Sequence, residues 1–151
     1  MIRMSKWDRK STFVDPFCGS GTLLIEAALL AANIPSCIER QHFAFKNFKN
    51  FDENLWEEIQ SNTKKRMHKI DIDLIGSDID SEMIFIAKRN IRPLPIARNI
   101  QLSVKSFDEW TDMSFQPGTL ICNPPYGERM GEEINEMYEA MGSWFKQQLP
   151  G

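Results

Sequence analysis

The sequence of 151 residues has few cysteines, and none of them stands in a C-x-x-C pair. The three cysteines are Cys18, Cys37 and Cys122. This spacing argues against a zinc site and against a disulfide framework, and it favours a reducing compartment. We therefore expect no bound metal.

Long apolar runs are also missing from the sequence. The longest, residues 23–32, is interrupted by Glu26 and is far too short to span a bilayer. The first six residues lack the apolar stretch that a signal peptide requires. We therefore predict a cytoplasmic protein that has no membrane partner.

A net positive charge is the third absence. The formal net charge of −3 gives no global attraction to nucleic acid, so any basic partner surface must be local. One candidate is the run Lys64, Lys65 and Arg66 with His68 and Lys69. The other interpretation of this run is the solvated end of a helix. The sequence leaves the oligomeric state unknown.

The composition that remains is that of an ordinary globular protein, with 42% apolar and 26% charged residues. Its length indicates one domain, residues 1–151. Strand patterns alternate with helix patterns along the chain, and there is no internal repeat. The expected strands are 12–14, 70–77, 100–104 and 119–122, and the expected helices are 22–32, 82–90 and 132–149.

This alternation predicts an α/β fold, a Rossmann-like open and mostly parallel sheet with flanking helices. The chain stops just after its last expected helix. A parallel sheet would continue with another strand there, so we expect the C-terminal strands of the sheet to lie outside this sequence.

Residues 35–69 form an aromatic-rich insertion whose second half, from Asp52 to about Lys69, is expected to be a helix. Its aromatic side chains could form a small satellite core packed over that helix. Because they are interleaved with Arg40, Lys46 and Lys49, they could also stack on bases.

The turn after the first expected strand, residues 15–22, has the residues of a ligand-binding loop. Gly19 and Gly21 allow positive φ and close approach of a ligand to the backbone. Leu24 stands where a dinucleotide-binding fingerprint would have its third glycine, which disfavours NAD. Asp15 would repel a pyrophosphate but suits a cationic group, such as the ammonium and sulfonium of S-adenosylmethionine (SAM). We count Phe17 among the residues of this cofactor loop.

Two further loops at strand ends supply candidate cofactor contacts. Asp78 ends the second strand, where a carboxylate can accept hydrogen bonds from a ribose diol, and Ile79 could cover one face of an adenine. Phe107 and Asp108 follow the third strand, and the Asp108 carboxylate could accept the adenine amino group. Asp80 better fits a helix cap.

The run Asn123, Pro124, Pro125 and Tyr126 follows the fourth strand and is the most specific signal. The lone pair of an aromatic amine is delocalised into its ring. Acceptors such as the Asn123 side-chain oxygen and the Pro124 carbonyl would draw that nitrogen toward tetrahedral geometry and aim its lone pair at a methyl donor. Tyr126 could stack on a base swung out of its helix or loop. Catalysis would then be positioning and electrostatics.

These motifs are similar to those of class I SAM-dependent methyltransferases. The chain most resembles the catalytic domain of the bacterial ribosomal-RNA large-subunit guanine-N2 methyltransferases (the RlmL and YpsC type), which are often labelled N6-adenine-specific DNA methylases. The resemblance covers nearly the whole chain. It rests on residues 15–28, on Phe43-Ala44-Phe45, on residues 76–80 and on residues 123–129.

The resemblance implies methylation of guanine N2 in 23S ribosomal RNA. It implies SAM contacts from residues 15–21, Asp78, Ile79 and Asp108, and contacts with the target amine from Asn123, Pro124 and Tyr126. In that family an RNA-binding THUMP domain normally precedes this domain, so we expect RNA binding, and part of the activity, to depend on segments outside this sequence. The alternatives are an N6-adenine DNA methyltransferase and a non-catalytic SAM-fold module that binds RNA.

Overall fold

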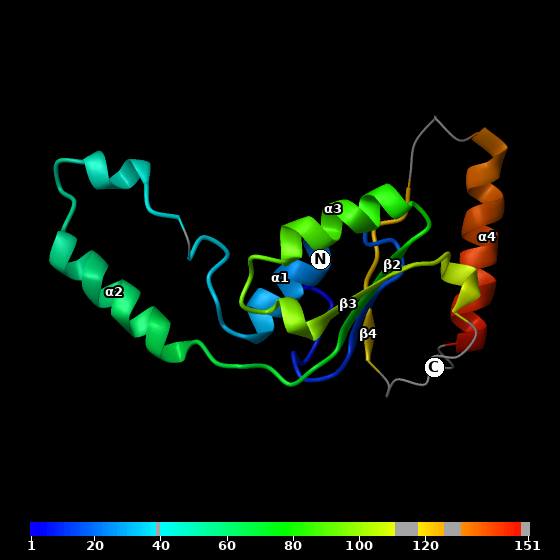
Figure 1. Ribbon diagram of the computed structural model, residues 1–151, viewed down its shortest axis with the longest axis horizontal. Coiled ribbons are helices and arrows are strands. Elements are labelled where there is room, and N and C mark those ends of the chain that lie inside the picture. Colours follow the sequence, from blue (N-terminus) through cyan, green and yellow to red (C-terminus); the bar gives the residue numbers. More distant parts are fainter. Residues whose placement is uncertain (39, 111–117, 126–130, 149–151) are drawn as a thin grey trace.

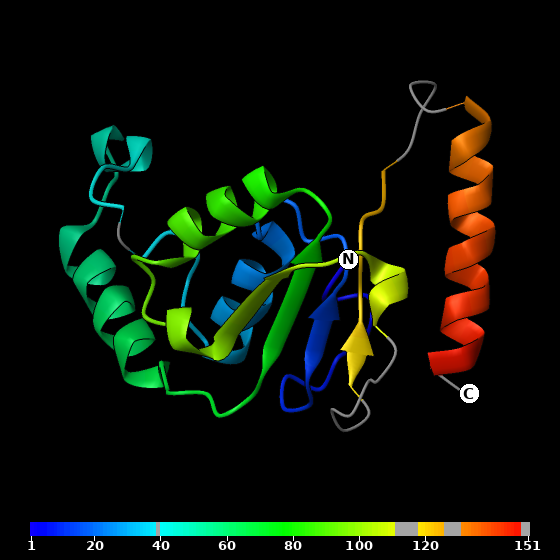
Figure 2. The same cartoon turned by 45° about the vertical axis from the view of Figure 1, so that its right-hand side comes forward.

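Four parallel strands form the centre of the molecule (Figures 1 and 2). The computed structural model describes residues 1–38, 40–110, 118–125 and 131–148. The strands are β1 (Phe13–Asp15), β2 (Leu74–Asp78), β3 (Ile100–Val104) and β4 (Thr119–Leu120). Their order in the sheet is β3-β2-β1-β4, and every neighbouring pair is parallel. The predicted fold class is therefore confirmed.

Helices cover both faces of this sheet (Figure 2). On one face lie α1 (Thr22–Ala31) and α3 (Ser81–Ile91), which contact β1, β2 and β3. On the other side lies α4 (Gly131–Gln148), which contacts the short 3-10 helix η3 (Phe107–Glu109). The two faces bury separate apolar cores.

The two cores follow from the alternation of side chains along each strand. In β1, Phe13 packs into the core under α1, while its neighbour Val14 packs into the core under α4. In β2, Leu74 and Ile75 divide in the same way. Successive residues of a strand point to opposite faces, so a strand buried on both faces is continuously apolar.

The predicted helix caps are confirmed at two positions. The Asp52 side chain accepts the Leu55 N–H (3.1 Å) at the start of α2 (Glu53–Arg66). The Asp80 side chain accepts the Glu82 N–H (2.8 Å) at the start of α3. An acceptor at the N-cap satisfies one of the free N–H groups of the first turn, and this fixes where each helix begins.

The expected strand over residues 70–77 is too long at its start, because β2 begins at Leu74. The side-chain amide of Asn99, in the 3-10 helix η2 (Ala97–Asn99), donates to the carbonyls of Ile70 (3.1 Å) and Ile72 (3.3 Å). The Asn99 side chain thus satisfies two carbonyls that a neighbouring strand would otherwise bond, so the ladder of β2 starts only at Leu74. β4 is likewise shorter than predicted, although the Ile121 N–H still donates to the Val14 carbonyl (3.0 Å).

Helix α2 ends at Arg66, three residues before the predicted end. Beyond it, the His68 N–H donates to the Ala32 carbonyl (3.0 Å), and the Asn33 side chain donates to the Arg66 carbonyl (3.2 Å). These bonds tie the end of α2 to the end of α1. The rest of α2 extends away from the sheet, and none of its residues is buried (Figure 1).

The aromatic side chains of the insertion pack on one another beside α2 and the 3-10 helix η1 (Ala44–Asn47). Ring centroids lie 5.1 Å apart for Phe43 and Phe45, and 5.0 Å apart for Phe45 and Trp56. The Lys46 ammonium lies 5.8 Å from the Trp56 ring centroid. The rings therefore pack on one another as the satellite-core interpretation predicted, but each stays partly exposed and none is buried.

Candidate functional site

The loop after β1 is fastened to the end of β2. The Cys18 N–H donates to the Ser77 carbonyl (2.9 Å), and the Gly19 N–H donates to Asp78 Oδ2 (2.9 Å). β1 and β2 are neighbours in register, with Asp15 opposite Gly76, so both strands release their chains at the same edge of the sheet. The first two predicted ligand loops therefore meet.

The two glycines of this loop both have left-handed backbone conformations, with φ of +50° at Gly19 and +84° at Gly21. A Cβ added at Gly21 would lie 3.3 Å from both Ala87 Cβ and Ile91 Cδ1, because α1 and α3 pack closely here. A Cβ added at Gly19 would meet no atom within 4 Å. Gly19 thus presents backbone next to open space, as a ligand-binding loop requires.

Helix α1 begins directly after these glycines and has no side-chain cap. Gly21 is its N-cap residue, and its first turn contains no acidic residue. The free N–H groups of a first turn and the helix dipole favour a negative group beyond the helix end. This end of α1 can therefore accept the carboxylate of an amino-acid-like ligand.

Asp15 is almost completely buried at the end of β1, with 1% of its surface exposed. The pKa of its carboxyl is raised from 3.8 to about 7, chiefly by burial and in smaller part by the nearby charge of Asp78. The Phe17 N–H donates to Asp15 Oδ1 (3.2 Å), which lowers the pKa in part. A cationic group brought next to Asp15 would favour its ionised form.

The Asp78 carboxylate joins the two loops. Besides the Gly19 N–H, it accepts the Asp80 N–H at Oδ1 (3.0 Å). Both oxygens thus orient the turn and still have acceptor capacity for a diol. Ile79, the next residue, exposes 76% of its surface, which leaves an apolar face at the same edge of the sheet.

Phe107 is buried, whereas the other predicted cofactor contacts at the ends of β2 and β3, Asp78, Ile79 and Asp108, are partly or fully exposed. Its ring centroid lies 5.3 Å from that of Phe17 and 6.0 Å from that of Trp144, so it belongs to the core under α4. The sequence did not indicate this burial. Asp108 is exposed, and the capping box of η3 is made by Ser106 and Glu109. Contacts of Phe107 and Asp108 with the cofactor remain predictions.

The fourth loop leaves the sheet beside the first. β4 pairs with β1, and the chain then continues through Asn123 and Pro125, which are both exposed, with the half-buried Pro124 between them. The Tyr138 hydroxyl of α4 donates to the Pro125 carbonyl (3.2 Å). Tyr126 lies outside the described residues, so its predicted stacking remains a prediction.

The strand order makes these loops neighbours. From β1 the chain runs through β2 to β3 in one direction, whereas β4 lies on the other side of β1. The switch point between β1 and β4 is where open α/β sheets bind ligands, beyond the carboxyl ends of the strands. Residues 15–21 are the loop that the sequence assigned to the cofactor, and Asn123 and Pro124 are two of the three residues that it assigned to the amine.

Two thiols flank this switch point. Burial raises the pKa of Cys18 to about 12 and that of Cys122 to about 11, and the charge of Asp15 contributes to both increases. The charge of Asp15 thus raises the pKa of a thiol in the loop after β1 and of a thiol at the start of the loop after β4. Both cysteines are neutral at physiological pH, so neither provides a thiolate nucleophile.

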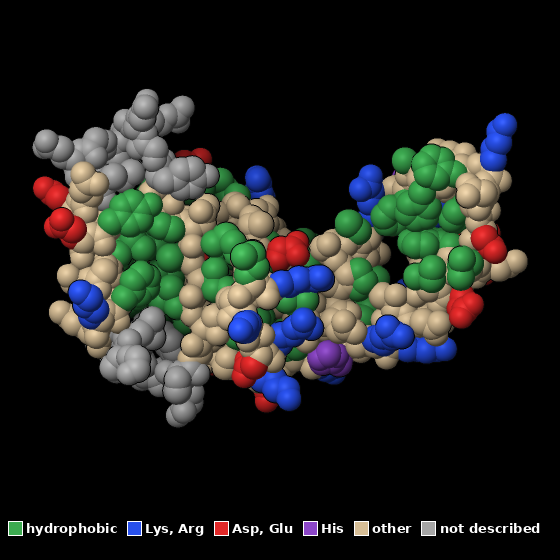
Figure 3. Space-filling model, turned by 180° about the vertical axis from the view of Figure 1, so that it is seen from behind, with side chains coloured by type: hydrophobic (Ala, Val, Ile, Leu, Met, Phe, Trp, Pro, Cys, Tyr) green, Lys and Arg blue, Asp and Glu red, His purple; other side chains and the backbone are tan. Residues whose placement is uncertain are grey.

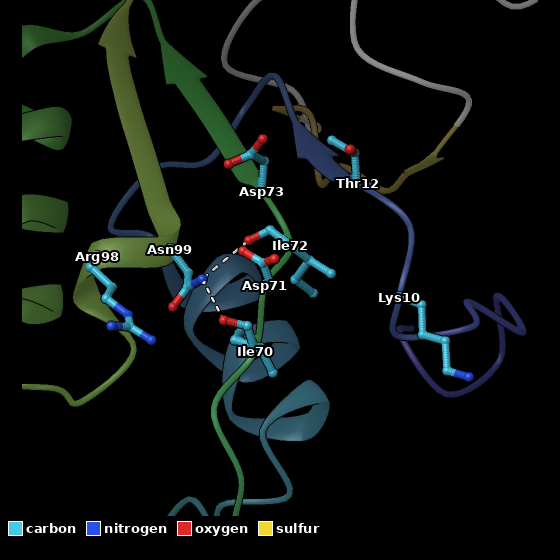
Figure 4. Close-up of a pocket in the computed structure, with 8 residues that line it drawn as sticks. All are labelled: Lys10, Thr12, Ile70, Asp71, Ile72, Asp73, Arg98 and Asn99. Carbon is cyan, nitrogen blue, oxygen red and sulfur yellow. Dashed lines mark hydrogen bonds between the residues drawn. The ribbon is translucent and has the colours of Figure 1, made fainter.

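A cavity of about 500 Å³ lies at the opposite, amino-terminal ends of the strands (Figure 4). Its polar side chains include Lys10, Asp73, Arg98 and Asn99. Asn99 bonds the carbonyls of Ile70 and Ile72, as the dashed lines show, and Asp73 accepts the Gln101 side chain (3.0 Å). These groups connect the strand starts, and the residues of the predicted site lie at the other edge.

Metal-binding groups and membrane-spanning helices are both absent from the described part of the chain. Among the described residues, no three or more His, Cys, Asp or Glu side chains come together as a metal-binding group. No helix within the described ranges has the length and apolar character needed to cross a bilayer.

Four residues that the sequence did not assign to the site pack around its loops. Ser77 is a completely buried hydroxyl, and Trp110 and Trp144 are buried indoles. At Gly76, an added Cβ would overlap the Leu24 Cδ1 methyl group. Two features of the sequence could have indicated the first three: a serine inside a buried strand, and tryptophans on apolar faces. A buried hydroxyl or indole N–H needs a hydrogen-bond partner, so such residues are expected to bond one another or the backbone.

The fold defines a class of protein, a doubly wound α/β domain in which the loops after β1 and β4 leave the sheet side by side at its switch point. The family model of the RMKL-like methyltransferase domain matches residues 1–151, the whole chain. The chain belongs to this family of methyltransferase domains.

Individual relatives agree with the family. The ribosomal RNA large subunit methyltransferase K/L of Shewanella baltica (strain OS185) is 39% identical over 158 residues, which cover 100% of this chain and 22% of that protein. The chain thus spans about a fifth of the length of this relative.

Solved structures share the fold. SMU.472, named as a methyltransferase and complexed with S-adenosylhomocysteine (SAH), superposes with a TM-score of 0.87 at 33% identity, over 97% of this chain and 39% of that one. A protein from Listeria monocytogenes str. 4b F2365, named a predicted N6-adenine-specific DNA methylase, superposes with a TM-score of 0.82 at 29% identity, over the same shares.

These comparisons confirm the predicted family and the predicted cofactor, SAM. The chain is a methyltransferase domain, and SAH is the molecule that SAM becomes when it has given up its methyl group.

Proposed function

We propose that the protein containing this chain methylates an exocyclic amine of a base in ribosomal RNA, with guanine N2 as the target. The observation that supports the proposal most is the adjacency of two loops. The glycine loop after β1 and the Asn123–Pro125 run after β4 leave neighbouring strands at one edge of the sheet. A methyl donor and a base amine held there would be close together.

The residues of the first two loops fit a SAM molecule. We assign the open backbone at Gly19 and Gly21 and the uncapped start of α1 to its amino-acid end. Asp15 lies beside that end and suits its positive charge. Asp78 would accept the ribose hydroxyls, Ile79 and Phe17 would cover apolar parts, and Asp108 with Phe107 would border the adenine.

SAM supplies a methyl group on a sulfonium, and the protein orients the nitrogen that receives it. The Asn123 side-chain oxygen and the Pro124 carbonyl would accept the two hydrogens of the amine. Two prolines restrict the loop, so little conformational entropy remains to be lost on binding. Tyr126 would stack on the extruded base.

We favour ribosomal RNA over DNA because the relative named for ribosomal RNA is more similar in sequence to this chain than the protein named as a DNA methylase. The Shewanella relative named for ribosomal RNA is 39% identical over the whole chain, whereas the Listeria protein named as a DNA methylase is 29% identical. A substrate in the ribosome also agrees with the predicted cytoplasmic location.

Basic side chains at the amino ends of the strands do not add to this support. Lys10 and Arg98 line the cavity there together with Asp71 and Asp73, and Lys69 and Arg98 line the one beside it. Figure 3 shows Lys and Arg side chains interspersed with Asp and Glu side chains on one face of the molecule. These mixed charges lie at the edge of the sheet opposite the two loops, so the proposal does not rest on them.

The test is transfer of a tritiated methyl group from SAM by the full-length protein, with ribosomal RNA and genomic DNA offered separately. Nucleoside analysis should find the label in N2-methylguanosine from RNA. Label in N6-methyladenine from DNA would establish the second candidate instead. SAM binding without transfer to either substrate would indicate the non-catalytic module.

The amine loop is tested by Asn123→Ala. Loss of one positioned hydrogen-bonding group should lower the transfer rate by about a hundredfold or more, while the Kd of SAM stays unchanged because Asn123 lies outside the cofactor loops. Asn54→Ala, an exposed asparagine in α2, is the control and should leave both values intact. Unchanged turnover in Asn123→Ala would refute the assigned role.

A further inference from the structure

A buried chain of hydrogen bonds connects α4 to the loop after β1. The Trp144 Nε1 donates to the Trp110 carbonyl (3.1 Å), and the Trp110 Nε1 donates to Ser77 Oγ (2.9 Å). Ser77 Oγ in turn donates to the Pro16 carbonyl (3.4 Å). Trp144, Trp110 and Ser77 are thus linked in series, and the last of them bonds a carbonyl of the glycine loop.

Every side chain in this chain of bonds is shielded from water. Ser77 is completely buried, and Trp110 and Trp144 each expose 6% of their surface. A buried donor or acceptor that loses its partner cannot turn to solvent, so each bond restricts the position of the next group. The position of Trp144 in α4 is therefore transmitted to Pro16.

Pro16 lies next to the residues that hold the loop on β2. The Cys18 and Gly19 N–H groups bond the Ser77 carbonyl and the Asp78 carboxylate. Ser77 thus contacts the loop through both its hydroxyl and its carbonyl. A shift of Ser77 or Pro16 would move the backbone of Gly19, which faces the open space assigned to the cofactor.

We propose that Trp144 is a positioning residue for the cofactor loop, acting through Trp110 and Ser77. The proposal rests on the assignment of this loop to SAM. Because α4 also bonds the Pro125 carbonyl through Tyr138, one helix braces both loops at the switch point. Trp144 touches neither the cofactor nor the base in this arrangement.

The experiment compares two identical substitutions, Trp144→Phe and Trp7→Phe. Trp7 is a matched control because its indole is buried to the same degree, with 7% exposed, and its Nε1 also donates to a backbone carbonyl, that of Ser11 (3.0 Å). It belongs to the core on the other face of the sheet. Both variants keep an aromatic ring and lose one indole N–H.

The first measurement is amide hydrogen exchange in the full-length protein without cofactor. Trp144→Phe should accelerate exchange at Cys18 and Gly19, and Trp7→Phe should not. The second measurement is the Kd of SAH by calorimetry. The bond is present before the cofactor binds, so its loss, worth about 1 kcal/mol, weakens binding by at most about fivefold. We expect weaker binding of SAH for Trp144→Phe alone.

The two measurements separate this proposal from the proposed function, since exchange needs neither a cofactor nor a substrate. Equal behaviour of the two variants, in exchange or in Kd, would overturn the role of Trp144. Faster exchange with an unchanged Kd of SAH would overturn it too. If Trp144→Phe does not fold, Ser77→Ala breaks the same chain of bonds at its centre and is measured against the same control.

Discussion

The most unusual group in the site is the Asp15 carboxyl, and an Asp15→Asn substitution tests its state directly. The variant keeps the shape of the side chain and an oxygen that can accept the Phe17 N–H. It removes the charge that is buried at the end of β1. We expect it to stabilise the protein at alkaline pH and to stabilise it much less at acidic pH.

The sign follows from the pKa of Asp15 in the two states. In the unfolded chain the carboxyl has its ordinary pKa of 3.8, and in the folded protein burial raises the pKa to about 7. Between these values the folded state binds the proton that the unfolded state has lost. The free energy of unfolding therefore falls as the pH rises from about 4 to about 7, and the destabilisation is complete above pH 7.

The magnitude comes from the difference between the two pKa values. At about 1.4 kcal/mol for each tenfold change in proton affinity, the full effect is about 4 kcal/mol. Relaxation of the protein around the charge reduces the effect. We therefore expect the free energy of unfolding of Asp15→Asn to exceed that of the unchanged protein by about 2–4 kcal/mol at pH 8.5 and by about 0.5–1 kcal/mol at pH 4.5.

The assay is urea unfolding of the protein without cofactor at both pH values. Asp71→Asn is the matched control, because Asp71 is an exposed carboxyl of the same kind at the other edge of the sheet. A gain that is the same at both pH values, or the same as in Asp71→Asn, would refute the idea that Asp15 carries a buried charge above pH 7.

Three further outcomes are expected. Gly76→Ala should lose about 1–3 kcal/mol of stability by urea unfolding, since its Cβ would overlap Leu24 Cδ1, whereas an unaltered midpoint would contradict this close packing. At pH 8, iodoacetamide should label the exposed Cys37 first, by mass spectrometry, and equal labelling of Cys18 and Cys122 would contradict their burial and raised pKa. Tyr138→Phe should slow methyl transfer without changing the Kd of SAM, because its hydroxyl bonds the Pro125 carbonyl, and a weaker Kd with normal transfer would assign it to the other loop.

Local patterns in the sequence predict much of this fold. The caps Asp52 and Asp80 and the glycines of the first loop act through residues within a few positions of themselves, so one sequence contains the whole signal. The places where strands end are equally local, and parallel strands then bring those ends to a single edge. This is why the sequence alone is enough to predict that residues 15–21 and 123–125 share one edge of the sheet.

The sequence could not predict which distant groups would meet. The side chain of Asn99 shortens β2 by bonding carbonyls 27 and 29 residues away. The Ser77–Trp110–Trp144 bonds join residues 33 and 34 positions apart, and the burial of Phe107 depends on the same packing of α4. Such contacts are set by how helices lie on a sheet, and no periodicity of one segment specifies them.

The buried charge of Asp15 destabilises the loop after β1, whereas the hydrogen bonds that fasten this loop to β2 stabilise it. The Asp15 charge is unfavourable in the free protein near neutral pH, because burial and the charge of Asp78 both raise its pKa. The hydrogen bonds that Cys18, Gly19 and Ser77 make hold the loop in place despite that cost. A cationic ligand group beside Asp15 would convert the cost into attraction, so the binding energy and the destabilisation of the free protein have the same origin. Asp15→Asn should therefore weaken SAM binding while it stabilises the fold, a pair of opposite changes that a purely structural aspartate would not give.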